Sequence, residues 1–211
     1  MNRALLTTAV AAAMIGGWAF VLRKIGAGDV YAVLGPYALV VVVTSLILRR
    51  SLERTSQDKA ETFLTMNVLV GAGLGVVMTI GTYAAYAVAE RLLPSLRAQV
   101  AGLYAAAHTE TVVAALAWTT VSIVAEELLF RGLLLESLRS AGAQKTVAAL
   151  VSLAAYVLVQ IGSGSWVIAA AALVCGAFWT VERVLTKSLV ASIISHAIWT
   201  LVVIHVYPLV G

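Results

Sequence analysis

The sequence has little charge and almost no cysteine. Only 11% of its 211 residues are Asp, Glu, Lys or Arg, whereas 62% are hydrophobic. A soluble domain carries roughly 25% charged residues because its surface faces water, so the composition excludes most soluble enzymes. The single cysteine, Cys175, excludes an intramolecular disulfide and a cysteine metal cluster. Cys175 lies in an apolar stretch, and we interpret it as a small packing residue.

The charge balance is basic, but it does not indicate nucleic-acid binding. The formal net charge is +4, and the Lys and Arg residues lie in short segments beside apolar runs, where lipid headgroups account for them. What the sequence has in quantity is apolar stretches near the length of about 20 residues that crosses a bilayer as a helix. We therefore expect an integral membrane protein that contacts lipid and binds no nucleic acid.

Apolar segments follow one another along the whole chain and predict an all-α bundle of about seven transmembrane helices. The first could instead be a signal peptide, although its apolar run is longer than a usual signal core. The fifth and sixth are short and are separated by Gly162 to Ser165, which predicts a helical hairpin. Residues 1–211 are expected to form a single membrane domain. The segments cover residues 4–22, 30–48, 62–89, 111–135, 146–161, 166–181 and 188–207.

The positive charges predict the orientation of the bundle. With the N-terminus inside, nine of the 14 Lys and Arg residues fall on the cytoplasmic side and four on the opposite side. This bias favours an N-in, C-out topology under the positive-inside rule. The nine are Arg3, Arg49, Arg50, Arg54, Lys59, Arg139, Lys145, Arg183 and Lys187, and the four are Arg23, Lys24, Arg91 and Arg97.

Between the third and fourth segments, apolar residues recur every three to four positions among polar ones. This amphipathic pattern predicts an interfacial helix on the outer surface, and a lid or substrate-docking element is the functional alternative. In the third segment, glycines at positions 71, 73 and 75 predict close packing against another helix. The amphipathic positions are Leu92, Leu96, Val100, Leu103 and Tyr104.

Three ionisable residues interrupt the fourth apolar segment: Glu126, Glu127 and Arg131. Each charge costs on the order of 3 kcal/mol at the centre of a membrane helix, so these residues are functional candidates. Glu127 and Arg131 are four residues apart and can pair on one helix face. Glu126 points about 100° away around the helix. We therefore expect Glu126 to face another partner and to be the reactive carboxylate, which suits a general base.

The seventh segment carries His196, with Thr200 four residues later on the same helix face. At about 1.5 Å per residue, His196 lies about 12 Å from the cytoplasmic end of its helix and Glu126 about 13 Å from that end of its own. We therefore predict that these two residues meet. The fifth segment adds Tyr156 and Gln160 on one face, although the same arithmetic places Gln160 deeper, at about 21 Å.

Together these residues resemble the motifs of the CAAX protease and bacteriocin-processing family, also called Abi. Residues 126–131 match its EExxxR pattern, residues 156–160 stand at its FxxxH motif, and residues 196–200 stand at its HxxxN or HxxxD motif. The resemblance covers residues 111–207, which we take as the catalytic core. It implies an all-helical intramembrane bundle with a polar cavity, and we expect the protein in the cytoplasmic membrane of a bacterium.

The resemblance also implies roles for the individual residues. Glu126 would be the base that activates water for peptide hydrolysis, and His196 would donate a hydrogen bond to the oxyanion. Glu127 and Arg131 would hold the site together. The expected substrate is a hydrophobic or lipidated peptide or protein, and no cofactor or metal is expected.

The chain departs from the family pattern at the residues that we expect to bind substrate. Gln160 stands where the family has a histidine, and glutamine orients water but takes up no proton near neutral pH. Thr200 replaces asparagine with a hydroxyl that still donates a hydrogen bond, and Tyr156 replaces phenylalanine conservatively. The chain is thus either a divergent protease or an inactive member that binds a hydrophobic peptide or a partner helix as an immunity or scaffold protein.

Other classes of membrane protein fit less well. A zinc protease would need ligands such as a helical HExxH pair, and the sequence contains none. A membrane serine protease would need a nucleophile with a histidine base, but Ser163 and Ser165 are more simply part of the hairpin turn. A proton-coupled transporter would need polar residues in a file across several helices, whereas here they concentrate at one level.

Overall fold

A computed structural model describes residues 3–24, 30–53, 64–107 and 111–210. The described residues are almost entirely helical and contain no strand, which confirms the all-α prediction. The elements are α1 (Arg3–Lys24), α2 (Val30–Glu53), α3 (Leu64–Leu92), α4 (Leu96–Ala107), α5 (Val112–Glu126), η2 (Glu127–Leu134), α6 (Leu135–Ser140), α7 (Lys145–Ile161), α8 (Trp166–Thr186), α9 (Leu189–Leu201) and η3 (Val202–Val206), where η marks a π-helix.

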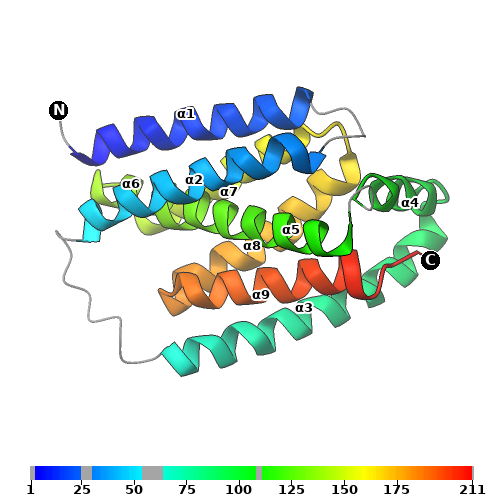
Figure 1. The fold of residues 1–211 in the computed structure, drawn as a ribbon. Helices are drawn as coiled ribbons and strands as arrows, with labels where there is room; N and C mark the ends of the chain where they lie inside the picture. The colour runs from blue at the N-terminus through cyan, green and yellow to red at the C-terminus, as the bar shows by residue number, and fades with distance from the viewer. Residues whose placement is uncertain (1–2, 25–29, 54–63, 108–110, 211) are drawn as a thin grey trace.

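The long helices run side by side in alternating directions, and the two ends of the chain lie at opposite ends of the bundle (Figure 1). Helices α2 and α7 contain shorter apolar stretches and pack within the same bundle. Helix α4 lies at the end of the bundle where the chain finishes (Figure 1). Among the described residues, five helical segments are long and apolar enough to cross a membrane: Arg3–Arg23, Leu64–Leu92, Val112–Ser140, Trp166–Thr186 and Leu189–Val206.

The helix predicted between the third and fourth segments is present as α4. Its Leu96, Val100 and Tyr104 are buried, and the Tyr104 hydroxyl donates to the carbonyl of Val203 at 2.8 Å. The assignment of Leu92 to this helix is wrong, because Leu92 is the last residue of α3 and is 72% exposed. The α conformation is disfavoured in the residue before a proline, and Pro94 therefore separates the two helices.

Helix α8 continues beyond the predicted end at residue 181. It includes Glu182 and Arg183, both of which are buried, and it ends at Thr186. The Arg183 guanidinium donates to Glu136 at 2.7 Å. Because this ion pair compensates the buried positive charge, the helix can continue past Arg183. Lys187 closes the helix in the left-handed conformation, with φ 56°.

Two of the three glycines at positions 71, 73 and 75 pack closely against α9, as predicted. A Cβ atom at Gly71 would lie 2.5 Å from the carbonyl oxygen of Ala191, and one at Gly75 would lie 3.0 Å from Ser195 Cα. A Cβ atom at Gly73 would meet nothing within 4 Å, so the prediction is wrong for this residue. Small residues let helix backbones approach closely, and α3 therefore lies along the helix that carries His196.

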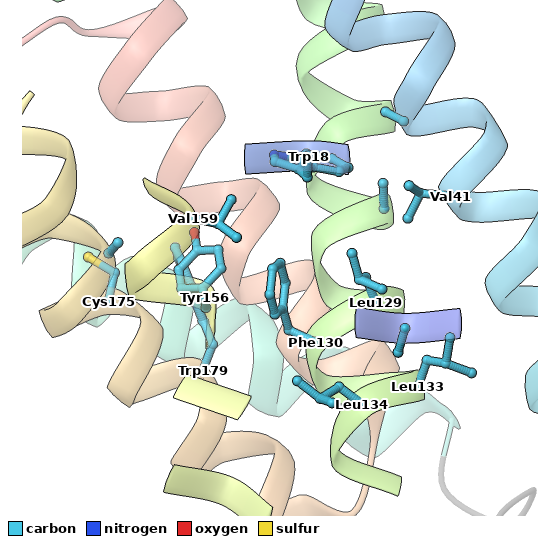
Figure 2. Packing of buried hydrophobic residues seen from close by; sticks show 14 of the residues in the cluster. Trp18, Val41, Leu129, Phe130, Leu133, Leu134, Tyr156, Val159, Cys175 and Trp179 are labelled. Carbon is cyan, nitrogen blue, oxygen red and sulfur yellow. The ribbon is translucent and has the colours of Figure 1, made fainter. Parts of the chain in front are cut away.

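The hydrophobic core surrounds η2 in the middle of the bundle. Phe130 lies edge to face with Tyr156, with ring centroids 5.2 Å apart. Figure 2 shows these two rings between η2 and α7, with Trp18 and Val41 on one side and Trp179 on the other. Aromatic pairs of this geometry add to the stability that their burial provides. The polar residues described below are thus held by a closely packed apolar frame.

Candidate functional site

The site begins where the α-helix of the fourth apolar segment becomes a π-helix. Glu126 is the last residue of α5, and Glu127 is the first of the eight-residue helix η2. All eight residues of η2 are buried. π-Helical stretches are rare, and they occur frequently at functional sites. The wider turn is a feature of this segment that apolar periodicity did not predict.

Glu127 is the centre of a fully buried charged cluster. Its Oε1 lies 3.3 Å from Arg131 NH1 and 2.9 Å from His196 Nδ1, and neither the Glu127 nor the Arg131 side chain is exposed. A carboxylate only accepts hydrogen bonds, so Nδ1 of His196 carries the proton in this contact. The imidazole ring also stacks on Trp179 at a centroid distance of 3.6 Å. These contacts fix the orientation of the ring.

Arg131 connects η2 to two further helices. Its NH2 group donates to the carbonyl of Gly176 on α8 at 3.1 Å, and its guanidinium lies over the Tyr156 ring on α7, 4.3 Å from the centroid. A cation over an aromatic face is attracted to it. A Cβ atom at Gly176 would lie 2.8 Å from the Tyr156 ring. The glycine therefore permits the close approach of these helices around Arg131.

Glu126 faces a different set of partners, as its position around the helix predicted. Its Oε2 accepts from the Tyr156 hydroxyl at 3.0 Å, and its Oε1 accepts from the Gln160 amide at 2.9 Å. His196 Nε2 lies 3.9 Å from Oε2. The predicted meeting of Glu126 and His196 is confirmed. The Glu126 side chain is 12% exposed, whereas the Glu127 side chain is 0% exposed.

The depth arithmetic for Gln160 is wrong. The structure brings its amide to the Glu126 carboxylate, although counting residues from the helix start placed it well beyond that level. The rise of about 1.5 Å per residue gives depth only for helices that begin at one level and run parallel to the membrane normal. The direct contact shows that Gln160 shares the level of Glu126.

Thr200 is the predicted site residue for which the described residues show neither a hydrogen bond nor an ion pair with the others. It lies one turn after His196 on α9, and its hydroxyl oxygen is buried without a hydrogen-bond partner among the described residues. The Nε2 atom of His205, a residue near the end of the last helical segment, lies 2.9 Å from the Thr119 hydroxyl and not at this site. The remaining histidine, His108, falls outside the described residues.

Sequence reasoning missed a third buried carboxylate beside the site. Glu182 on α8 is 3% exposed, and its Oε2 accepts from the Ser195 hydroxyl at 2.5 Å. Ser195 directly precedes His196 in α9, so this contact fastens the segment that positions the imidazole ring. In the sequence, Glu182 directly follows the sixth apolar segment. It was not recognised as a site residue because that segment was predicted to end at residue 181.

The arrangement offers a carboxylate, an imidazole and an amide at one place, which is suited to moving protons and donating hydrogen bonds. Within the part of the chain that the structure describes, no group of three or more His, Cys, Asp or Glu side chains could hold a metal ion. The site residues come from α5, η2, α7, α8 and α9. The site therefore forms only when the C-terminal half of the chain is folded.

Comparison with known proteins gives one finding for this half of the chain. Residues 108–202 match the family model described as type II CAAX prenyl endopeptidase Rce1-like. The matched range contains every site residue predicted from the sequence and confirms the resemblance that the EExxxR pattern carried. No curated protein and no solved structure matches the chain.

Proposed function

We propose that this chain, a member of the CAAX protease family through its C-terminal half, is an intramembrane endopeptidase that hydrolyses a membrane-proximal peptide with water activated by Glu126. The matched family is a family of proteases. The observation that carries the proposal is the difference between the two adjacent carboxylates. Glu127 is fully buried and pairs with Arg131, whereas Glu126 is partly exposed and accepts only from neutral donors among its hydrogen-bond partners.

In the proposed reaction, a water molecule bound at Glu126 gives a proton to the carboxylate and its oxygen attacks the scissile carbonyl carbon. Glu126 then returns the proton to the leaving amine as the C–N bond breaks. General acid–base catalysis of this kind requires a group within hydrogen-bond reach of the reacting water. Gln160 donates to Glu126 Oε1, so it orients the carboxylate and, through its amide oxygen, the water.

His196 is the proposed donor to the oxyanion that forms during the attack. Its Nδ1 side is held by Glu127, and its Nε2 lies on the Glu126 side of the ring. With Nδ1 already bonded to a carboxylate, Nε2 donates when the ring carries both protons. Donors fixed before the reaction stabilise developing negative charge efficiently. Arg131 and Trp179 keep this geometry by holding Glu127 and the imidazole ring.

Tyr156, Gln160 and Thr200 form the proposed substrate-binding side. The buried Thr200 hydroxyl has no hydrogen-bond partner among the described residues, and buried polar groups are usually paired. A backbone group of a bound peptide would supply that partner. The substrate is a hydrophobic or lipidated peptide or protein, reached through the lipid. The charge bias supports an N-in, C-out orientation in a bacterial cytoplasmic membrane.

A second candidate function is binding without hydrolysis. The observation that favours it is the Gln160 amide, which occupies Glu126 Oε1 where the family pattern has a histidine. In that case the same residues bind a hydrophobic peptide or the helix of a membrane protein partner, as an immunity or scaffold protein would.

The two functions are separated by assaying the full-length protein in nanodiscs against a membrane-peptide library, with products identified by mass spectrometry. Wild type is compared with Glu126→Gln, Gln160→His and the control Glu90→Gln, which makes the same substitution at a more exposed glutamate. Cleavage by wild type and Glu90→Gln that is lost in Glu126→Gln is the expected result. If wild type is inert and Gln160→His alone gains cleavage, the binding function is correct.

A further inference from the structure

A basic pocket lies away from the proposed active site, where α6 and α8 end and α7 begins. Its lining includes four cationic side chains and one carboxylate. This end of the bundle is the one at which α1 begins (Figure 1), and the charge bias assigns it to the cytoplasmic side. The charged residues of the pocket are Arg139, Lys145, Arg183, Lys187 and Glu136.

The arginines of this basic pocket share the single carboxylate. Glu136 Oε1 lies 2.7 Å from Arg183 NH2, and Glu136 Oε2 lies 3.8 Å from Arg139 NH1. Arg183 is 8% exposed, and its buried Nε has no hydrogen-bond partner among the described residues. One carboxylate compensates for one of four positive charges. The pocket therefore retains positive charge around a guanidinium that is largely removed from water.

The lysines complete the pocket from its open side. Lys145 and Lys187 are both exposed, and neither forms an ion pair with another described residue. Lys145 is the first residue of α7, whose N-terminus has no side-chain cap. Free backbone N–H groups at a helix N-terminus favour an anion. Guanidinium and ammonium groups are the side chains that bind phosphate in proteins.

Exposed apolar side chains begin within one helical turn of the pocket residues on α7 and on α8, two helices that pack against each other. On α7 these are Val147, Leu150 and Val151, and on α8 they are Val181 and Leu185, with exposed fractions from 44% to 74%. A ligand with a phosphate group and long apolar chains would match both surfaces at once, whereas a soluble phosphate would use only the pocket.

We infer that the basic pocket binds the phosphate headgroup of an anionic phospholipid of the cytoplasmic leaflet, whose acyl chains lie along the exposed apolar side of α7 and α8. Basic pockets between membrane helices on the cytoplasmic side are suited to such headgroups. In this site the phosphate oxygens accept from Arg139, Lys145 and Lys187. The largely buried guanidinium of Arg183 adds positive charge to the pocket. The inference does not depend on the proposed hydrolysis.

The test is a titration of the purified full-length protein with phosphatidylglycerol or phosphatidylcholine, followed by native mass spectrometry. Wild type is expected to retain phosphatidylglycerol about tenfold better than phosphatidylcholine. The double variant Lys145→Gln with Lys187→Gln is expected to lose this preference. The double variant Arg91→Gln with Arg97→Gln removes the same charge at the opposite end of the bundle and is expected to keep it.

Three results would overturn the inference. The first is the absence of any difference in phosphatidylglycerol preference between the two double variants. The second is displacement of the lipid from wild type by millimolar glycerol phosphate, which would indicate a soluble phosphate ligand. The third is displacement by a peptide with a free C-terminal carboxylate but not by its amide, which would assign the pocket to a peptide.

Discussion

Two sides of the candidate site differ although their carboxylates are neighbours in the sequence. On the closed side, the fully buried Glu127 carboxylate and Arg131 guanidinium compensate each other's charge. On the open side, a carboxylate with neutral hydrogen-bond donors keeps some access to solvent. The closed side consists of Glu127, Arg131 and Trp179, and the open side consists of Glu126, Tyr156 and Gln160. His196 lies between them, with Nδ1 at Glu127 and Nε2 toward Glu126.

The difference indicates that the two neighbouring carboxylates contribute in different ways: Glu127 contributes to stability and, in the proposed reaction, Glu126 contributes to catalysis. A buried ion pair that loses one partner leaves an uncompensated charge, which is strongly destabilising. A carboxylate held only by neutral donors leaves no such charge when it is replaced by an amide. We therefore expect substitutions on the closed side to lower the free energy of unfolding, and substitutions on the open side to lower turnover in a folded protein.

The largest expected effect is that of Glu126→Gln on turnover of a peptide identified in the library. The amide takes up no proton, so the rate should fall on the order of 10³-fold or more, within the range for loss of a general base. Unfolding of the detergent-solubilised protein should change little, because the Tyr156 hydroxyl still finds an acceptor. A variant that retains wild-type turnover would show that Glu126 is not the base.

The next effect concerns the adjacent residue. Glu127→Gln removes the charge that compensates Arg131 at 3.3 Å in full burial, so the free energy of unfolding should fall by about 3 to 5 kcal/mol. Denaturant titration in detergent measures this loss. Comparison with Glu126→Gln matches the substitution and differs by one position. Equal stability of the two variants would contradict the division into a closed and an open side.

A smaller effect on stability is expected from Gly176→Ala. The new methyl group would lie 2.8 Å from the Tyr156 ring and 3.3 Å from Arg131 NH2, so the side chains must shift at a cost of about 1 to 3 kcal/mol. Gly73→Ala is the matched control within a helix, because nothing lies within 4 Å of the added methyl group. That control should be neutral or slightly stabilising, since alanine favours helix over glycine. Equal thermal stability of both variants would show that the closed side tolerates overpacking.

Much of the fold could be predicted because lipid imposes a simple rule on the sequence. Apolar stretches near 20 residues mark the helices, and the cost of buried charge marks Glu126, Glu127 and Arg131 as exceptional. The meeting of Glu126 with His196 followed from a common depth. The π-helix η2, the contact of Gln160 with Glu126 and the pair of Glu182 with Ser195 could not be predicted. These depend on helix tilt and on local hydrogen bonding, which leave no periodic signal in the sequence.

The smallest expected effect is that of Tyr156→Phe, and it separates the two sides most directly. Tyr156 donates to Glu126 through its hydroxyl and faces the Arg131 guanidinium with its ring. Phenylalanine keeps the ring and therefore the cation–π contact, but it removes one hydrogen bond to a carboxylate, which is worth about 1.5 to 3 kcal/mol. Without that hydrogen bond the carboxylate is less well oriented. Turnover should therefore fall only about tenfold, and the free energy of unfolding should fall by no more than that hydrogen bond is worth. A large loss of stability with unchanged turnover would place Tyr156 on the closed side instead.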